Sequence, residues 1–318
     1  MERREFLLNS VAAFGTRLLT GKAANSESSP SGTASRTYHV FGVPLRTGSL
    51  VPGNENDAQA YRDVQVVSRL QAAGCNVVDE GDVAIPSYLP HHSVPPIRNW
   101  PGPRIAWDCI SDRIAPCLQQ AGQVPFLIGC DCSVVVGTTQ ALLRTSPEEI
   151  YVLYIDGDFD DAQPDAKHCN SAAACAVWLL TNDSPFWAGP PLRPSGVSVI
   201  GWSRPSRSAK SGRGSMSLAE VRRAGPQEAA LHALQLIPAS ASILLHFDSD
   251  VVQAPELPTA YFPHEEGLTL SEAGELLRVF LSDSRIRIIE VSEYAALRDL
   301  DHRYVSKLVG LFSDALHR

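Results

Sequence analysis

Short apolar runs that alternate with helix-like stretches constrain the fold of this chain more than any other feature of its sequence. The apolar runs, expected to be buried strands, are residues 38–43, 76–79, 125–129, 150–155, 196–201, 242–247 and 285–291. The stretches expected to be helices are residues 58–73, 107–121, 218–223, 226–236, 270–281 and 303–317. This alternation predicts an α/β fold in which a mainly parallel sheet is covered by helices on both faces.

Carboxylates and thiols follow several of the predicted strands at the point where the chain leaves the sheet. They are Cys130, Asp131, Cys132, Asp156, Asp158, Asp160, Asp248, Asp250 and Glu290. Ligands of parallel sheets bind beyond the carboxyl ends of the strands, so these side chains are expected to face one crevice. Carboxylates this close repel one another, and burying them without compensation is costly. These loops are therefore either solvated turns or loops whose carboxylates bind a cation. Two Asp-x-Asp pairs directly after strongly apolar strands favour cation binding.

The bulk composition argues against several classes of function. A formal net charge of −8 is unlike that of a nucleic-acid or anionic-membrane binder, which needs a basic patch, and is compatible with a cationic substrate. Seven cysteines in 318 residues, an odd number, do not indicate a disulfide framework. No apolar run reaches the roughly 18 residues of a membrane-spanning helix. No glycine-rich phosphate loop follows a strand, which argues against a nucleotide-binding protein.

The amino-terminal segment resembles a twin-arginine export signal. The stretch "RREFLL" at residues 3–8 precedes a moderately apolar region, which Arg17 interrupts, and small residues at 22–24. An amphipathic or disordered arm is the alternative. Residues 25–36 are rich in Ser, Gly and Pro and predict a flexible linker. We therefore expect a signal and linker over residues 1–36 and an α/β domain over 37–318, in a protein that is periplasmic or otherwise exported if the signal functions and cytoplasmic if not.

Four motifs at the predicted strand ends are similar to those of one enzyme family. They read GCDCS at 129–133, DGDFD at 156–160, FDSD at 247–250 and EVS at 290–292. With the flanking stretches 70–82 and 263–277, they resemble the ureohydrolases, which include arginase and agmatinase. The family patterns are Gly-Gly-Asp-His-Ser, Asp-Ala-His-x-Asp, Ser-Phe-Asp-x-Asp and Glu-Val-Asn-Pro. The resemblance runs from residue 38 to the carboxyl terminus and implies a single three-layer α/β/α domain with a mostly parallel sheet.

The resemblance implies a hydrolase with two manganese ions and a bridging hydroxide that attacks a guanidinium carbon and releases urea. The expected substrate is a small cationic compound with a linear amidine or guanidino C–N bond, and the expected assembly is a homotrimer or homohexamer. Matching the motifs gives the candidate metal ligands Cys132, Asp156, Asp158, Asp160, Asp248 and Asp250. Hard carboxylate oxygens suit Mn²⁺, and two close cations lower the pKa of the water between them.

Two of these candidate ligands depart from the family pattern. Cys132 and Asp158 stand where the family has metal-binding histidines. Both side chains can bind metal, but the more anionic set holds cations more tightly and makes a bridging water less acidic. The Cys132 thiolate also makes Zn or Fe an alternative to Mn. A cysteine-rich site, in which the Cys130–Cys132 pair approaches Cys169 and Cys175, is a further alternative.

The same resemblance suggests residues for catalysis and substrate binding. The candidate catalytic residues are Asp131, Asp160, Glu290 and His168, and the candidate substrate-binding residues are Glu290 and Asn170. Glu290 matches the family glutamate that binds the guanidinium, with a strand-end salt bridge as the alternative. His168 takes the role of the family's loop histidine only if its loop is arranged differently, and is otherwise a surface histidine.

A catalytically degenerate family member, acting as a scaffold or binding protein, is the competing interpretation. Loss of both histidine ligands and of the loop histidine supports it. The family's metal-binding aspartates nevertheless all survive, at positions 156, 160, 248 and 250, whereas a chain without selection for metal is expected to lose one. The sequence therefore favours an active hydrolase with an altered metal or substrate preference.

Overall fold

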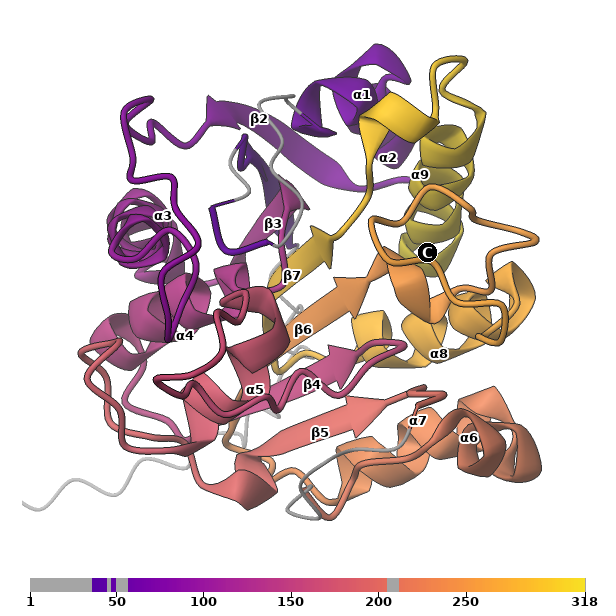
Figure 1. Ribbon diagram of the computed structural model, residues 1–318. Helices are drawn as coiled ribbons and strands as arrows, with labels where there is room; N and C mark the ends of the chain where they lie inside the picture. Colours follow the sequence, from indigo (N-terminus) through magenta and orange to yellow (C-terminus); the bar gives the residue numbers. More distant parts are fainter. Residues whose placement is uncertain (1–35, 45–46, 50–56, 205–211, 318) are drawn as a thin grey trace, which may run out of the picture. The chain divides into compact units, whose positions relative to one another are not determined.

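A parallel sheet runs through the centre of the computed structural model, which describes residues 36–44, 47–49, 57–204 and 212–317 (Figure 1). Its strands are β1 (Thr37–Gly42), β2 (Asn76–Asp82), β3 (Gln123–Cys130), β4 (Ile150–Ile155), β5 (Val197–Ile200), β6 (Ser242–Asp248) and β7 (Ile286–Ser292). They lie in the order β2-β1-β3-β7-β6-β4-β5, and each neighbouring pair is parallel. The predicted strands are confirmed, and β3, β7, β6 and β4 lie next to one another in the sheet interior.

Helices cover both faces of this sheet (Figure 1). They are α1 (Asp57–Asp63), α2 (Val66–Ala72), α3 (Gly102–Leu118), α4 (Val134–Thr145), α5 (Ala176–Thr181), α6 (Leu218–Ala224), α7 (Pro226–Gln235), α8 (Leu270–Ser282) and α9 (Arg303–Leu316), with 3₁₀ turns η1 (Ala173–Cys175), η2 (Pro194–Gly196), η3 (Ser249–Val251) and η4 (Ala296–Arg298). Helices α3, α4 and α5 share one hydrophobic core, and the other helices share a second.

The interior strands β3 and β4 are apolar and buried on both faces, unlike the edge strand β2. In β3, Phe126 and Ile128 belong to the core under α1, α2 and α9, whereas Leu127 belongs to the core under α3 and α4. Alternate side chains of a strand point to opposite faces, so a strand buried on both sides needs a continuous apolar run. This arrangement confirms the predicted α/β fold with its sheet between helical layers.

Several helices differ from the sequence expectation, and the short helix α5 has no predicted counterpart. The helix expected over residues 58–73 is divided into α1 and α2, because Gln65 is left-handed with a φ of 59°. Helix α3 begins at Gly102 instead of residue 107, because Pro103 suits a first helical turn, where its missing N–H is not needed. The sequence does not predict α4, since residues 134–136 are β-branched valines. Their burial against the sheet outweighs that weak local preference.

The described part of the chain falls within one compact unit, Ala34–Arg318. Among the described residues, none of the helices has both the length and the apolar character needed to cross a bilayer. The expected export signal and most of the linker lie in residues 1–35, outside the described residues, so that assignment and the boundary at residue 36 stay predictions.

Gly129 connects the end of β3 to the first motif. Its φ is +75°, and a Cβ added there would lie 2.3 Å from the backbone nitrogen of Ala58 in α1. Only glycine tolerates both this conformation and this approach. Helix α1 can therefore pack directly against the strand end that leads into Cys130 and Cys132.

Gly129→Ala is expected to lower the free energy of unfolding by about 2–4 kcal/mol, because backbone strain and a clash with α1 add together. Gly74→Ala is the matched control, since Gly74 has a φ of +89° with no atom within 4 Å of an added Cβ. The control should lose only about 1–2 kcal/mol. Urea denaturation followed by circular dichroism measures both. Equal losses would show that the contact with α1 is not tight.

Candidate metal centre

Four buried side chains from three strand ends form what we call the first cluster. They are Cys132, Asp156, His246 and Asp248, and one ligand atom of each lies within 4.8 Å of the others. Cys132 follows β3 and Asp156 follows β4, whereas His246 and Asp248 belong to β6. Because β4 pairs with β6 in parallel, the residues that follow their last paired positions lie side by side at one edge of the sheet.

Asp158, Asp250 and His264 form the second cluster, whose ligand atoms also lie within 4.8 Å of one another. His264 lies in the loop between η3 and α8 and is 2% exposed. Its Nε2 atom is 3.3 Å from Asp158 Oδ2 and 3.5 Å from Asp250 Oδ2. Three segments of the chain therefore converge on this cluster.

Backbone hydrogen bonds hold the two clusters next to each other. Asp158 N donates to Asp156 Oδ1 at 2.6 Å. Asp250 N donates to Asp248 Oδ1 at 2.7 Å in the same way. Gly157 N donates across the two loops to Asp250 Oδ1 at 3.1 Å. Each Asp-x-Asp pair thus gives one carboxylate to each cluster, and turns of this side-chain-to-backbone type set the spacing between them.

The first cluster is short of positive charge in the metal-free protein. Burial raises the pKa of Asp156 and of Asp248 well above the usual value, and the nearby Asp250 carboxylate raises both further. Burial also raises the pKa of the Cys132 thiol, as does Asp248. Anionic groups in this state are stabilised by a bound cation, which becomes the largest local charge in such a site.

The second cluster contains its own cationic group. Burial alone lowers the pKa of His264, but Asp158 and Asp250 raise it to about 9. For Asp158 the directions are reversed. Burial raises the pKa of this carboxyl, but the neighbouring His264 lowers it overall. Neither ring nitrogen of His264 completes a hydrogen bond within the described residues. Imidazole and carboxylate are ligands for Mn, Fe and Zn alike, so this donor set fits a divalent cation.

A chain of hydrogen bonds leads from the first cluster into the protein core. Cys132 Sγ donates to Asp248 Oδ2 at 2.6 Å and lies 3.2 Å from Ser292 Oγ. Ser292 Oγ is 3.1 Å from His246 Nε2. His246 Nδ1 is 2.7 Å from Glu290 Oε2, and both of these side chains are 0% exposed. The chain fixes the imidazole of His246 in one orientation beside the cluster.

The predicted metal ligands other than Asp160 all lie in the two clusters. Asp160 has a φ of 49°, and its Oδ2 accepts a hydrogen bond from the Tyr154 hydroxyl at 2.7 Å. The Tyr154 ring stacks on His246 with centroids 4.3 Å apart. Asp160 therefore connects to the first cluster through this aromatic ring, and its roles as ligand and catalyst stay predictions.

Asp131 and Glu290 are both buried. Asp131 Oδ2 accepts a hydrogen bond from Gly48 N at 3.0 Å, and its Oδ1 accepts one from Ser133 Oγ at 2.6 Å. These bonds tie the loop after β3 to the segment that contains Gly48. Glu290 bonds His246 through one carboxylate oxygen, while its Oε1 completes no hydrogen bond within the described residues. Their catalytic and substrate-binding roles stay predictions.

Among the described residues, His168 belongs to neither cluster. The side chain of His168 is 73% exposed and pairs with Asp165 at 2.8 Å. Asn170 donates through Nδ2 to the Gln163 carbonyl at 3.3 Å. In the described residues neither cluster contains a cysteine other than Cys132, so the cysteine-rich alternative has no geometric support.

Sequence reasoning missed three buried side chains at this site. His246 precedes Asp248 by two positions in β6 and so shares its face, a signal that strand periodicity offers. His264 lies in a loop whose course no local pattern predicts. Glu293 is 4% exposed, and its Oε1 accepts a hydrogen bond from Cys132 N at 3.3 Å. Its φ of 60° turns the chain back toward Cys132 after β7.

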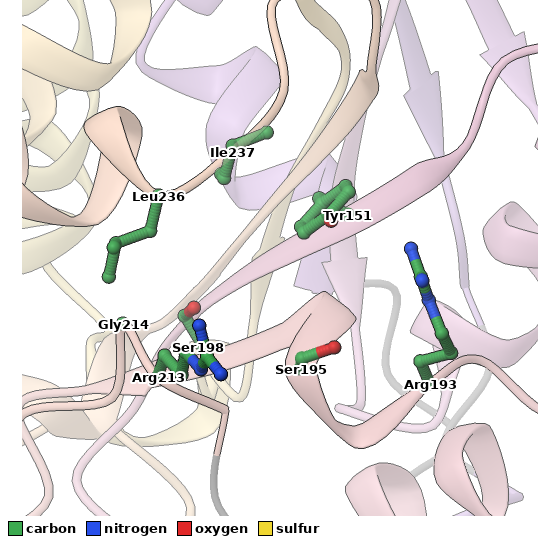
Figure 2. Close-up of a pocket in the computed structure, with 8 residues that line it drawn as sticks. All are labelled: Tyr151, Arg193, Ser195, Ser198, Arg213, Gly214, Leu236 and Ile237. Carbon is green, nitrogen blue, oxygen red and sulfur yellow. The ribbon is translucent and has the colours of Figure 1, made fainter.

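A cavity of about 320 Å³ lies elsewhere in the fold (Figure 2). Its lining residues are Tyr151, Arg193, Ser195, Ser198, Arg213, Gly214, Leu236 and Ile237. Tyr151 and Ser198 are the second residues of β4 and β5, so the cavity faces the amino ends of these strands. The two clusters of candidate ligands occupy the carboxyl ends, and the cavity does not belong to them.

The sequence matches the family described as "Arginase family" over residues 36–313. The curated arginase of Agrobacterium fabrum is 26% identical over 175 residues, which is 52% of this chain and 53% of that protein. The match thus spans about half the length of that relative. The crystal structure of arginase from Bacillus cereus has a TM-score of 0.76 at 19% identity, and the alignment covers 89% of this chain and 99% of that one. Formimidoylglutamase from Bacillus subtilis has a TM-score of 0.70 at 16% identity, with 90% and 87% covered.

Asp248→Asn is expected to stabilise the metal-free protein, increasingly so as the pH rises from about 4 to 8. The pKa of Asp248 is raised in the folded state, so the stability that this carboxyl contributes is lost as it ionises with rising pH. The variant does not titrate there and should gain on the order of 1 kcal/mol relative to wild type in chelator at pH 8. Denaturation at several pH values measures this difference.

Adding metal should make wild type more stable than the Asp248→Asn variant. A cation at about 100 times its dissociation constant stabilises the folded state by about 2.7 kcal/mol, and the variant should gain much less. Asp314→Asn, on the exposed face of α9, is the control and should follow wild type in both states. Identical behaviour of the two variants, with and without metal, would contradict a cation at Asp248.

Proposed function

The chain belongs to the arginase family, and we propose that it is a metal-dependent hydrolase of a linear amidine or guanidino C–N bond that releases urea. One observation carries the proposal, namely two adjacent ligand clusters at the carboxyl edge of the sheet. The fold places ligand sites at this edge. The names of the similar proteins, arginase and formimidoylglutamase, support amidine-type chemistry in general.

On this proposal the first cluster holds one cation and the second cluster holds another. Two divalent cations, when bound, lower the pKa of water and stabilise negative charge at the reacting centre. The protein keeps the anionic ligands in place through the peptide N–H groups of Gly157, Asp158 and Asp250. Manganese is the metal of the family resemblance, whereas the Cys132 thiolate favours Zn or Fe.

A cationic substrate fits the carboxylates that reach solvent. The side chain of Asp158 is 33% exposed, and the guanidinium of Arg204 lies 3.8 Å from its Oδ2. A substrate guanidinium has the same charge and the same planar donors as this arginine. We therefore propose that a cationic substrate contacts Asp158 before the other described carboxylates of the site.

A second candidate function, a degenerate family member that acts as a scaffold or binding protein, is favoured by the position of Glu290. This residue, predicted to bind the guanidinium, is 0% exposed and bonded to His246. A substrate could reach it only if the core around β7 opened. Metal content and urea release separate the two candidates.

The hydrolase is expected to bind about two metal ions per chain and to release urea from one of a panel of guanidino compounds, or the corresponding amide from one of a panel of amidino compounds. The full chain is loaded with Mn²⁺, Zn²⁺ or Fe²⁺, desalted, and assayed by elemental analysis and by detection of urea or of the amide. Asp156→Asn should lower urea release at least about 100-fold. His232→Gln, exposed on α7, is the control and should leave it unchanged.

Bound metal without release of urea or of an amide from any compound would favour a metal-stabilised binding protein. Absence of metal after loading would favour the scaffold and end the hydrolase proposal.

We also propose export, on the strength of the paired arginines at positions 3 and 4. The twin-arginine route carries folded proteins, which is compatible with a metal loaded before export. Replacing both arginines, as Arg3→Lys with Arg4→Lys, should retain the protein in the cytoplasm of a bacterial host. Arg17→Lys is the control. Cell fractionation measures both. Wild-type protein that stays in the cytoplasm would argue for a simple amino-terminal arm, and unchanged export of the double variant would overturn the twin-arginine assignment.

A further inference from the structure

We propose that His246 and His264 supply, from other positions in the chain, the two imidazole ligands that Cys132 and Asp158 have displaced. Each histidine would serve one cluster, so that each metal position receives one nitrogen ligand. The inference rests on the proposed function in that it concerns the same site. It goes further in naming ligands at positions where the ureohydrolase motifs have none.

The position of His264 supports this role. The imidazole is 2% exposed, and its Nε2 lies 3.3 Å and 3.5 Å from carboxylate oxygens of Asp158 and Asp250. Neither ring nitrogen completes a hydrogen bond within the described residues. Nε2 instead faces the two carboxylate oxygens at ion-pair distance, so a cation held among these three atoms would have one nitrogen and two oxygen ligands. A protonated imidazole offsets the carboxylates as well, so the experiment below measures metal itself.

Gly157 makes the space that His264 occupies. A Cβ added at Gly157 would lie 2.5 Å from His264 Cδ2 and 2.9 Å from Asp250 Oδ1. Contacts below 3.0 Å are essentially never seen for real Cβ atoms, so any other residue at 157 would displace the ring or the aspartate. The motif of the ureohydrolases has alanine here, directly before its histidine. Gly157 and Asp158 therefore both depart from the family motif, and the presence of His264 accounts for both departures.

His246 has the arrangement of a ligand supported by a second residue. Its Nδ1 is 2.7 Å from Glu290 Oε2, and both side chains are fully buried. A carboxylate on one ring nitrogen holds the proton there and leaves the other nitrogen, Nε2, available to a metal. Nε2 faces Ser292 Oγ at 3.1 Å, and the ring belongs to the first cluster with Cys132 and Asp248. Glu290 is then a positioning residue for His246.

The two proposed ligand sets differ in chemical hardness. The first contains a thiolate, an imidazole and two carboxylates, and the second contains an imidazole and two carboxylates. Thiolate ligands favour Zn or Fe, whereas carboxylates suit Mn. The protein is therefore expected to bind unlike metals, with the softer ion beside Cys132 and the harder ion beside His264.

The test is the metal content of the full chain after loading with Mn²⁺ and Zn²⁺ together, followed by desalting. His264→Ala and the more conservative His264→Gln should each lose about one ion per chain, mainly manganese. Gly157→Ala should lose the same ion, because its Cβ displaces the ring. His232→Ala, exposed on α7, should keep both ions. Unchanged content in both His264 variants would overturn the assignment.

A double variant separates displacement of His264 from an independent effect of the glycine. If Gly157→Ala acts through His264, then Gly157→Ala with His264→Ala loses no more metal than either single variant. Additive losses would show that Gly157 acts on Asp250 instead and would overturn its link to His264. The thermal midpoint of each metal-free variant confirms that it is folded.

Glu290→Gln tests the His246 half of the proposal. The amide cannot hold the His246 proton as a carboxylate does, so the affinity for zinc should fall about 10–100-fold, as measured by competition with a chromogenic chelator. Manganese content should not change. A merely structural role would lower the metal-free thermal midpoint and leave zinc affinity intact, which would overturn the assignment of Glu290 and His246.

Failure of this inference and failure of the proposed function give different results. Loss of one ion in the His264 variants without urea release by wild type would support the ligands and exclude the hydrolase. Urea release with metal content unaffected by the His264 and Glu290 variants would overturn only the ligands. Wild-type protein that binds no metal would overturn both.

Discussion

Repulsion among buried carboxylates is the constraint on which the site depends. Asp156, Asp248 and Asp250 lie at neighbouring strand ends, and each is less than 5% exposed. The peptide N–H groups of their own loops offset part of this charge. A domain is stable by only about 5–15 kcal/mol, so an unbalanced cluster of this kind would use a large share of that margin. Protonation of these carboxyls, a buried imidazole or a bound cation can each relieve this repulsion, so the stability of the site is linked both to pH and to cations.

The parallel sheet makes this crowding possible. Strands β3, β7, β6 and β4 are apolar on both faces and lie between two hydrophobic cores, so their ends are held rigidly. Rigid strand ends fix ligand atoms with short loops, which lose little conformational entropy when a metal binds. Gly129 contributes at β3, where its left-handed backbone lets α1 approach the strand end.

Metal coordination depends on the type and the position of the donor atoms, whichever residues of the chain supply them. On the proposed assignment, the nitrogen donors lost at positions 132 and 158 return through His246 and His264. The first reaches the site from within β6, two residues before Asp248. The second enters from a loop through the space that Gly157 leaves. Such an exchange keeps the number of ligands while changing hardness, and with it the metal that each position prefers.

The sequence by itself determined the fold and most of the acidic candidate ligands. Continuous apolar strands can be buried only in a covered parallel sheet, and Asp156, Asp158, Asp248 and Asp250 follow from strand ends alone. Only the tertiary structure decided which other side chains join them. His264 is far from these motifs along the chain, and whether its loop folds over Gly157 depends on packing that no local periodicity encodes. The same holds for Glu290, whose neighbour His246 lies on another strand, so its burial is a property of the sheet and not of its own motif.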